Sequence, residues 1–194
     1  KWEKMGHQVT VITCFPNFPN GKVFEGYKNK LYQKENLHGI NVIRVWSYMA
    51  ENNGFIKRIM DYMSYALVSF LFGLFVKSNI IIATSPQFFT AISGRMLSFF
   101  KNTSWVMEVR DLWPDSIAAV GSMSKSSKSF ELLKRIEHRL YLSSSKIVVV
   151  TDSFKRYLIS EHEIRPEKIG VFKNSVLIDN FKSSEPTEVI SLKT

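Results

Sequence analysis

Residues 79–86 read N-I-I-I-A-T-S-P, and this stretch decides the fold class. The five residues from Asn79 to Ala83 are almost wholly apolar, which is typical of a strand buried on both faces. Ser85 and Pro86 suit the start of a helix, with the serine as cap and the proline in the first turn. Apolar positions from 88 to 100 continue that helix. A buried strand that leads directly into a helix is the repeating unit of a parallel α/β sheet.

The same alternation extends in both directions along the chain. Further strands are predicted at residues 8–13, 41–46, 105–109, 146–150 and 168–172, and further helices at 54–76, 130–142 and 151–160. Right-handed connections between such strands produce a doubly wound, Rossmann-like α/β domain with a parallel sheet. The segment 121–129, rich in serine and lysine, is expected to be a mobile loop.

Composition narrows the class of protein. With 194 residues, of which 45% are apolar, the chain is long enough for one domain with a buried core. Its net charge of +9 favours contact with an anionic partner, such as lipid headgroups or a phosphorylated substrate. No arginine-rich arm, zinc-finger spacing or RNA-binding aromatic motif accompanies this charge, so nucleic acid is not an expected partner. Cys14 is the sole cysteine, which excludes an intrachain disulfide and fits a reducing compartment.

Parallel α/β sheets bind ligands beyond the carboxyl ends of their strands, where loops and the positive ends of helices converge. Arg110-Asp111 is the most suggestive pair at that edge. A carboxylate there can orient or deprotonate a hydroxyl group, while the neighbouring cation holds negative charge. The alternative is an ion pair that merely terminates the strand.

A long loop follows the strand predicted at 8–13. It runs from Phe15 to Tyr32 and combines aromatic rings, amides and lysines, which suits stacking on sugar rings or holding a phosphate. Alternatively, these aromatic rings pin the loop to the body of the domain. The four histidines of the chain are too scattered to indicate a metal site.

Residues 59–76 are mostly apolar and nearly long enough to cross a membrane, which needs roughly 20 apolar residues. Asp61 and two serines lie within them, and a crossing would separate the strand at 79–83 from its sheet. A buried or interfacial helix is therefore preferred. Lys57 and Lys77 at its ends suit peripheral contact with anionic headgroups.

Four segments together resemble glycosyltransferase family 4. They are G-H-Q-V-T-V-I-T-C-F-P-N-F-P-N-G-K at residues 6–22, A-T-S-P at 83–86, E-V-R-D-L-W-P-D-S at 108–116 and V-V-V-T at 148–151. Within that family, the pattern looks like the WbuB-type branch of O-antigen and capsule assembly, which includes fucosamine transferases. Each segment alone is weak evidence, but their combination is specific and the similarity covers residues 6–181.

This resemblance implies a GT-B enzyme, whose two Rossmann-like domains face each other across a cleft. The N-terminal domain takes the acceptor and the other takes a nucleotide-sugar, here expected to be UDP-linked. The resemblance implies retention of the anomeric configuration without a metal or cofactor, because basic side chains and helix N-termini neutralise the departing diphosphate. A lipid-linked or glycan acceptor is expected, at the cytoplasmic face of the bacterial plasma membrane. Carried onto this chain, the resemblance implies a catalytic Asp111 and acceptor contacts from Arg110, Phe15, Asn17, Asn20, Lys22 and Ser85.

The resemblance also implies a domain organisation. Residues 1–182 are expected to form the acceptor domain without its first strand, and residues 183–194 to lead toward a donor domain outside this sequence. The family's hinge motif is matched only in part at 174–181, where Ser175 and Leu177 replace glycine and aspartate. Two other functions stay open: a non-catalytic module that binds an acceptor or a partner subunit, and a nucleotide-binding regulator.

Overall fold

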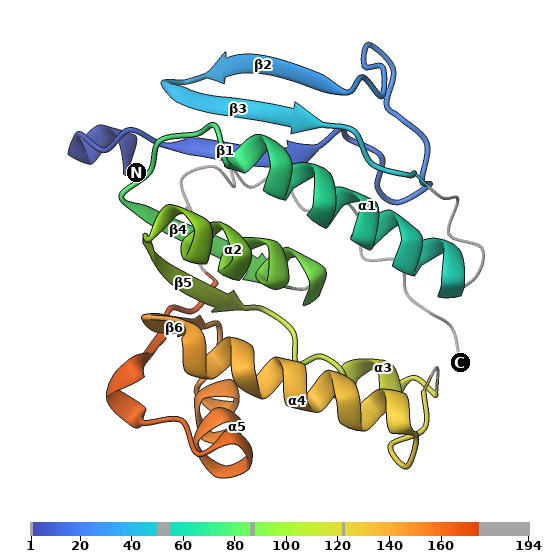
Figure 1. The fold of residues 1–194 in the computed structure, drawn as a ribbon, viewed down its shortest axis with the longest axis vertical. Coiled ribbons are helices and arrows are strands. Elements are labelled where there is room, and N and C mark those ends of the chain that lie inside the picture. Colours follow the sequence, from blue (N-terminus) through green and yellow to red (C-terminus); the bar gives the residue numbers. More distant parts are fainter. Residues whose placement is uncertain (1, 50–54, 86–87, 122, 175–194) are drawn as a thin grey trace, which may run out of the picture.

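The computed structural model describes residues 2–49, 55–85, 88–121 and 123–174 (Figure 1). From β3 onward, strands and helices alternate, as the sequence predicts. The strands are β1 Thr10–Cys14, β2 Tyr32–Leu37, β3 Ile40–Val45, β4 Ile80–Ser85, β5 Ser104–Val109, β6 Lys146–Val149 and β7 Ile169–Val171. The helices are α1 Phe55–Gly73, α2 Phe88–Lys101, α3 Asp115–Ala119, α4 Lys128–Ser143 and α5 Asp152–His162, with short 3-10 helices at Glu3–Met5 and Pro166–Lys168.

Four parallel strands form the larger sheet, in the order β4-β5-β6-β7. Their central positions are apolar because helices pack against them, and Trp105, Val109, Ile147 and Val149 are at most 2% exposed. The prediction of an α/β fold with a parallel, Rossmann-like sheet is therefore confirmed.

The smaller sheet has the order β1-β3-β2 and contains a strand that was not predicted. β1 pairs with β3 in parallel, whereas β2 runs antiparallel to β3. The two-residue turn at His38 and Gly39 has positive φ at both positions, which is the geometry that closes a tight hairpin. The Asn36 side chain supports this turn by accepting a hydrogen bond from the Gly39 N–H at 3.1 Å. β2 escaped prediction because its sequence, Y-Q-K-E-N-L, is mostly polar, as suits an edge strand.

The strands form two separate hydrogen-bonded sheets within the described residues, and this corrects the expectation of a single sheet. β1 pairs with β3 and β4 pairs with β5, but β1 and β4 do not pair with each other. A cavity of about 160 Å³ is lined by Thr10 and Ile12 of β1, by residues 80–83 of β4 and by residues of α1 and α2. The Tyr65 hydroxyl donates to the carbonyl of Ile12 at 2.8 Å, so a helix side chain satisfies part of the free β1 edge.

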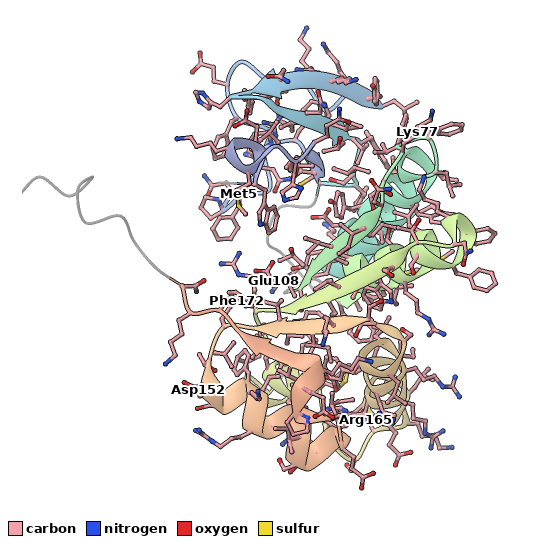
Figure 2. All side chains as sticks on the ribbon, turned by 90° about the vertical axis from the view of Figure 1, so that its left-hand side faces the viewer. Met5, Lys77, Glu108, Asp152, Arg165 and Phe172 are labelled. Atoms are coloured by element: carbon pink, nitrogen blue, oxygen red, sulfur yellow. The ribbon has the colours of Figure 1, made fainter. Side chains whose placement is uncertain are left out.

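Helices α1 and α2 lie side by side on one face of the strands (Figures 1 and 2). Small residues allow their close approach: the hydroxyls of Ser69 and Ser93 are 3.2 Å apart. Gly94 lies so close to the sheet that an added Cβ would come within 2.5 Å of the Ala83 Cβ. Among the residues that the structure describes, no helix is long and apolar enough to cross a membrane.

Several helices and loops begin or end at residues other than those predicted from the sequence. Ser85 is the last residue of β4, paired with Val109, and α2 is first seen at Phe88, so the predicted cap falls on residues that include ones outside the described part of the chain. Pro86 lies outside the described residues, as do the domain boundary at 182, the tail 183–194 and all but the first residue of the hinge motif. The predicted loop 121–129 is shorter than expected, because Ser127 caps α4 by accepting from the N–H of Phe130.

Candidate functional site

The carboxyl ends of the parallel strands lie on one edge of the molecule, toward which the arrowheads of β3 and β5 point in Figure 1. The segments that follow β1, β3 and β5 carry polar side chains at this edge. Two groups of residues gather there. One is the turn after β5, and the other lies between the ends of β1 and β3 and the first half of α1.

Asp111 is the second residue after β5 and is half-buried. Its Oδ1 accepts a hydrogen bond from the N–H of Leu112 at 2.9 Å. Oδ2 has no protein partner within the part of the chain that the structure describes, so it remains available to a ligand. Arg110 is exposed, and the described residues show no ion pair between it and Asp111. The pair therefore does not simply neutralise itself at the end of the strand.

The turn that carries Asp111 is packed firmly against the helices. Trp113 meets Tyr62 of α1 edge-on, with ring centroids 6.3 Å apart, and stacks on Phe88 of α2 at 6.4 Å. The N–H of Ser116 donates to the Leu112 carbonyl at 2.8 Å, which joins the turn to α3. These contacts hold the backbone after Asp111, and the pairing of Val109 with Ser85 and Val149 holds the strand before it, so the carboxylate lies on an ordered backbone.

A partly buried ion network holds the other side of the same turn. Asp115 Oδ2 accepts from Lys134 Nζ at 3.0 Å and from the Tyr157 hydroxyl at 2.6 Å. Lys134 Nζ also donates to Glu137, whose side chain is 1% exposed, at 2.8 Å. Burial alone would raise the pKa of Asp115, but the hydrogen bonds from Tyr157 and Lys134 outweigh it and hold that pKa below its usual value. Burial also raises the pKa of Tyr157 to about 12. Each charged group of this network therefore has a partner within the protein, and the network holds the turn in place.

The second group of residues contains polar atoms without partners. Asn29 Oδ1 and Ser47 Oγ are buried and have no hydrogen-bond partner in the described residues. They are neighbours, because Asn29 Nδ2 donates to the Ser47 carbonyl at 2.8 Å. A buried polar atom without a partner costs about 1–3 kcal/mol, so such atoms in a native fold indicate a place for a water or a ligand group.

Asp61 of α1 faces this second group. Burial raises the pKa of its carboxyl, and the nearby Ser47 hydroxyl offsets part of that rise, although the two groups do not meet hydrogen-bond geometry. Cys14, at the end of β1, lies close enough that the Asp61 charge adds to the effect of burial in raising the pKa of the thiol. A desolvated carboxylate beside unsatisfied polar atoms at the ligand-binding edge of an α/β sheet is a feature of binding sites.

The loop residues predicted to contact an acceptor differ in how far they are exposed to solvent. Phe15 is fully buried and packs edge-on against Tyr27, so its ring is not presented to solvent. Asn17 is half-buried, and its Nδ2 donates to the Phe15 carbonyl at 3.0 Å. Asn20 and Lys22 are exposed. For Phe15, the structure thus favours the alternative in which the ring pins the loop to the domain.

Ser85 is 2% exposed at the end of β4 and lies on the side of the sheet that α2 covers. Asn29, Ser47 and Asp61 were not predicted as site residues. The one available signal was Asp61, a carboxylate in an otherwise apolar helical segment. The described residues contain no group of three or more histidine, cysteine, aspartate or glutamate side chains placed to hold a metal ion.

Comparison with known proteins supports a transferase role at a coarse level. No protein-family profile matches the chain. The chain is 26% identical over 194 residues to WcaI of Escherichia coli (strain K12), a glycosyl transferase assigned to colanic acid biosynthesis. The match includes 97% of this chain but 47% of the relative, so the chain spans about half the length of that protein. This similarity and the α/β fold with its parallel sheet are those expected of a Rossmann-like half of a glycosyltransferase.

Proposed function

We propose that this chain is the acceptor-side domain of a glycosyltransferase that moves a sugar from a nucleotide-sugar to a lipid-linked acceptor in cell-surface polysaccharide synthesis. The observation that carries the proposal is the Asp111 carboxylate. It stands at the carboxyl end of a central parallel strand, rigidly held, with one oxygen available to a ligand. The similarity to a glycosyl transferase supplies the reaction class.

Asp111 orients the acceptor hydroxyl and takes up its proton as the hydroxyl oxygen bonds to the anomeric carbon. The bond between that carbon and the diphosphate breaks, and because the oxygen enters on the face that the diphosphate leaves, the configuration is retained. A carboxylate within hydrogen-bond reach of a hydroxyl raises its nucleophilicity, and general-base catalysis of this kind contributes about 10²–10⁴-fold to rate. Arg110, exposed beside it, attracts the negative charge of the donor phosphates. Asp111 is fixed through Trp113 and Asp115, so little motion is needed to reach the reactive geometry.

Asp61, Ser47 and Asn29 bind further hydroxyl groups of the acceptor, or ordered water in its place. The support is the pair of buried oxygens without partners and the raised pKa of the Asp61 carboxyl. The contact between Tyr62 and Trp113 joins this group to the Asp111 turn, so both can act on one sugar. The exposed Asn20 and Lys22 would border the same acceptor.

The remaining features of the proposed enzyme lie outside this chain. The donor, proposed to be UDP-linked, binds a second Rossmann-like domain of a GT-B enzyme of family 4. Transfer with retention and without a metal follows the same proposal, since basic side chains and helix N-termini can neutralise a departing diphosphate. The enzyme would act at the cytoplasmic face of the plasma membrane, where lipid-linked acceptors are assembled.

The test uses the full-length protein and Asp111→Asn, which keeps the size of the side chain and removes its negative charge. Transfer of radiolabelled sugar from a panel of UDP-sugars to membrane lipid extract is measured, with kcat and KM determined separately. We expect kcat to fall at least 100-fold with little change in KM for the donor. Glu131→Gln, on the exposed surface of α4, is the matched control and should retain full activity. Unchanged transfer by Asp111→Asn would overturn the assignment of this residue.

A further inference from the structure

The outer side of α1 carries a continuous stripe of exposed apolar side chains. Ile56, Met60, Met63, Leu67 and Leu71 are 73%, 49%, 53%, 59% and 47% exposed. Their spacing of three or four residues places them along one side of the helix. The opposite side of α1 packs inward, where Ser69 and Gly73 are buried against α2. The stripe is therefore the side of α1 that does not pack against the rest of the domain.

The neighbouring helix α2 extends this apolar surface. Phe99, Phe100 and Met96 of α2 are 80%, 64% and 40% exposed, and Phe75, just after α1, is 87% exposed. Phe70 and Phe100 have ring centroids 5.6 Å apart, which joins the two helices near their carboxyl ends. We call these nine exposed residues the α1–α2 outer face: Ile56, Met60, Met63, Leu67, Leu71, Phe75, Met96, Phe99 and Phe100. Soluble monomers rarely leave contiguous apolar surface of this extent without a partner.

The charges around the α1–α2 outer face indicate what covers it. Residues 55–101 contain five basic residues and one acidic residue, Asp61. Lys57, Arg58, Lys77 and Arg95 are exposed at its margins, and Figure 2 shows Lys77 on the side of the molecule where α1 and α2 lie. Asp61 instead faces the inner group around Ser47. An apolar surface bordered by cations and free of outward carboxylates complements an anionic bilayer, because long basic side chains reach the headgroups while apolar ones enter the acyl boundary.

We propose that the α1–α2 outer face binds the surface of an anionic lipid bilayer, with α1 parallel to the membrane plane. Since the inner side of α1 is part of the protein core, the helix lies on the membrane and does not cross it. Met60 points toward lipid and the next residue, Asp61, faces the candidate acceptor site. Asp61 of the proposed sugar site is therefore next to a lipid-facing residue of the same helix, as suits an acceptor whose headgroup is held at the membrane surface. Binding of the α1–α2 outer face to lipid does not depend on the proposed function. Only the identity of the acceptor at this membrane surface rests on that proposal.

The experiment is co-sedimentation of the purified chain with vesicles. Vesicles of phosphatidylglycerol and phosphatidylcholine are compared with vesicles of phosphatidylcholine alone, at low and high salt. We expect binding to the anionic vesicles at least tenfold stronger than to the neutral ones, and weakened by salt. Leu67→Gln combined with Leu71→Gln should reduce this binding at least tenfold. Leu132→Gln, at a 57% exposed site on α4, is the matched control and should bind as the original chain does.

Circular dichroism of each variant verifies that it is folded. Equal binding by the Leu67→Gln/Leu71→Gln variant and the original chain would overturn the proposal. So would self-association in the absence of lipid that the same variant abolishes, because a second copy would then be the occupant. In the full-length enzyme, this variant should still transfer sugar to a water-soluble acceptor analogue, whereas Asp111→Asn should not. The two proposals can therefore fail separately.

Discussion

Lys134→Met tests whether the partly buried ion network stabilises the turn that carries Asp111. Lys134 Nζ lies 2.8 Å from Glu137 Oε2, 3.0 Å from Asp115 Oδ2 and 2.9 Å from the Tyr157 hydroxyl. Methionine fills a similar volume, but it cannot replace the positive charge. The Glu137 carboxylate, 1% exposed, would then lose its lysine and keep, among the described residues, only the Tyr141 hydroxyl at 2.8 Å and the His162 Nε2 at 3.3 Å as partners.

Breaking a buried ion pair from one side costs about 3–5 kcal/mol, which is a large part of the roughly 5–15 kcal/mol that stabilises a typical domain. Each kcal/mol lowers Tm by about 2–4 °C in a domain of about 150–250 residues, so we expect Tm to fall by about 6–20 °C. Urea denaturation at pH 7, followed by far-UV circular dichroism, measures the free energy of unfolding directly.

Two further variants make the measurement specific. Arg135→Met breaks the exposed pair between Arg135 and Glu131, whose side chains are 72% and 61% exposed, and should cost less than about 1 kcal/mol. Adding Glu137→Gln to Lys134→Met removes the stranded charge and should restore part of the lost stability. A Lys134→Met protein within about 1 kcal/mol of the original, or a double variant no more stable than the single one, would refute this account.

Further predictions concern Asp61 and two buried glycines. Because burial raises the pKa of Asp61 in the folded state, this group favours folding below its unfolded pKa and loses that contribution as pH rises through the folded pKa. Asp61→Asn should therefore raise Tm at pH 7, and this gain should vanish near pH 3 in a scan by differential scanning fluorimetry. Gly94→Ala places a Cβ 2.5 Å from the Ala83 Cβ on a rigid strand, so overpacking of about 1–3 kcal/mol should exceed the roughly 1 kcal/mol gained in helix propensity. Gly73→Ala meets only the flexible end of Leu97, so urea denaturation should show it to be at least as stable as the original chain; equal losses at both glycines would contradict the distinction.

The sequence predicted those parts of the fold whose signal is local. The strands around Ile81, Met107 and Val148 were found because runs of apolar residues mark burial on both faces. β2 was missed because an edge strand needs no apolar run, and its signal lay in the turn at His38 and Gly39. In the larger sheet the chain order of the strands and their spatial order coincide, so local patterns sufficed there.

The candidate site was predicted only in part. Asp111 follows a recognisable buried strand, and strand ends mark the ligand-binding edge of parallel sheets, so its place could be inferred. Asn29, Ser47 and Asp61 come from three separate segments, and only folding brings them together. Their role depends on burial and on missing hydrogen-bond partners, and neither property can be read from residue type alone. Phe15 illustrates the converse, since an aromatic residue in a loop carries no local sign of whether its ring faces solvent or core.

By itself, the sequence determined the α/β class, the parallel direction of the larger sheet and the position of a carboxylate at the end of β5. These follow from apolar runs and helix periodicity, which act within a single segment. The tertiary structure alone decided which side of α1 is buried. That helix is apolar on nearly all sides, so its pattern does not distinguish an inner from an outer face. One side is buried because Tyr65 contacts β1 and Ser69 contacts α2. The other side has no neighbouring element among the described residues, so Met60, Leu67 and Leu71 are exposed there.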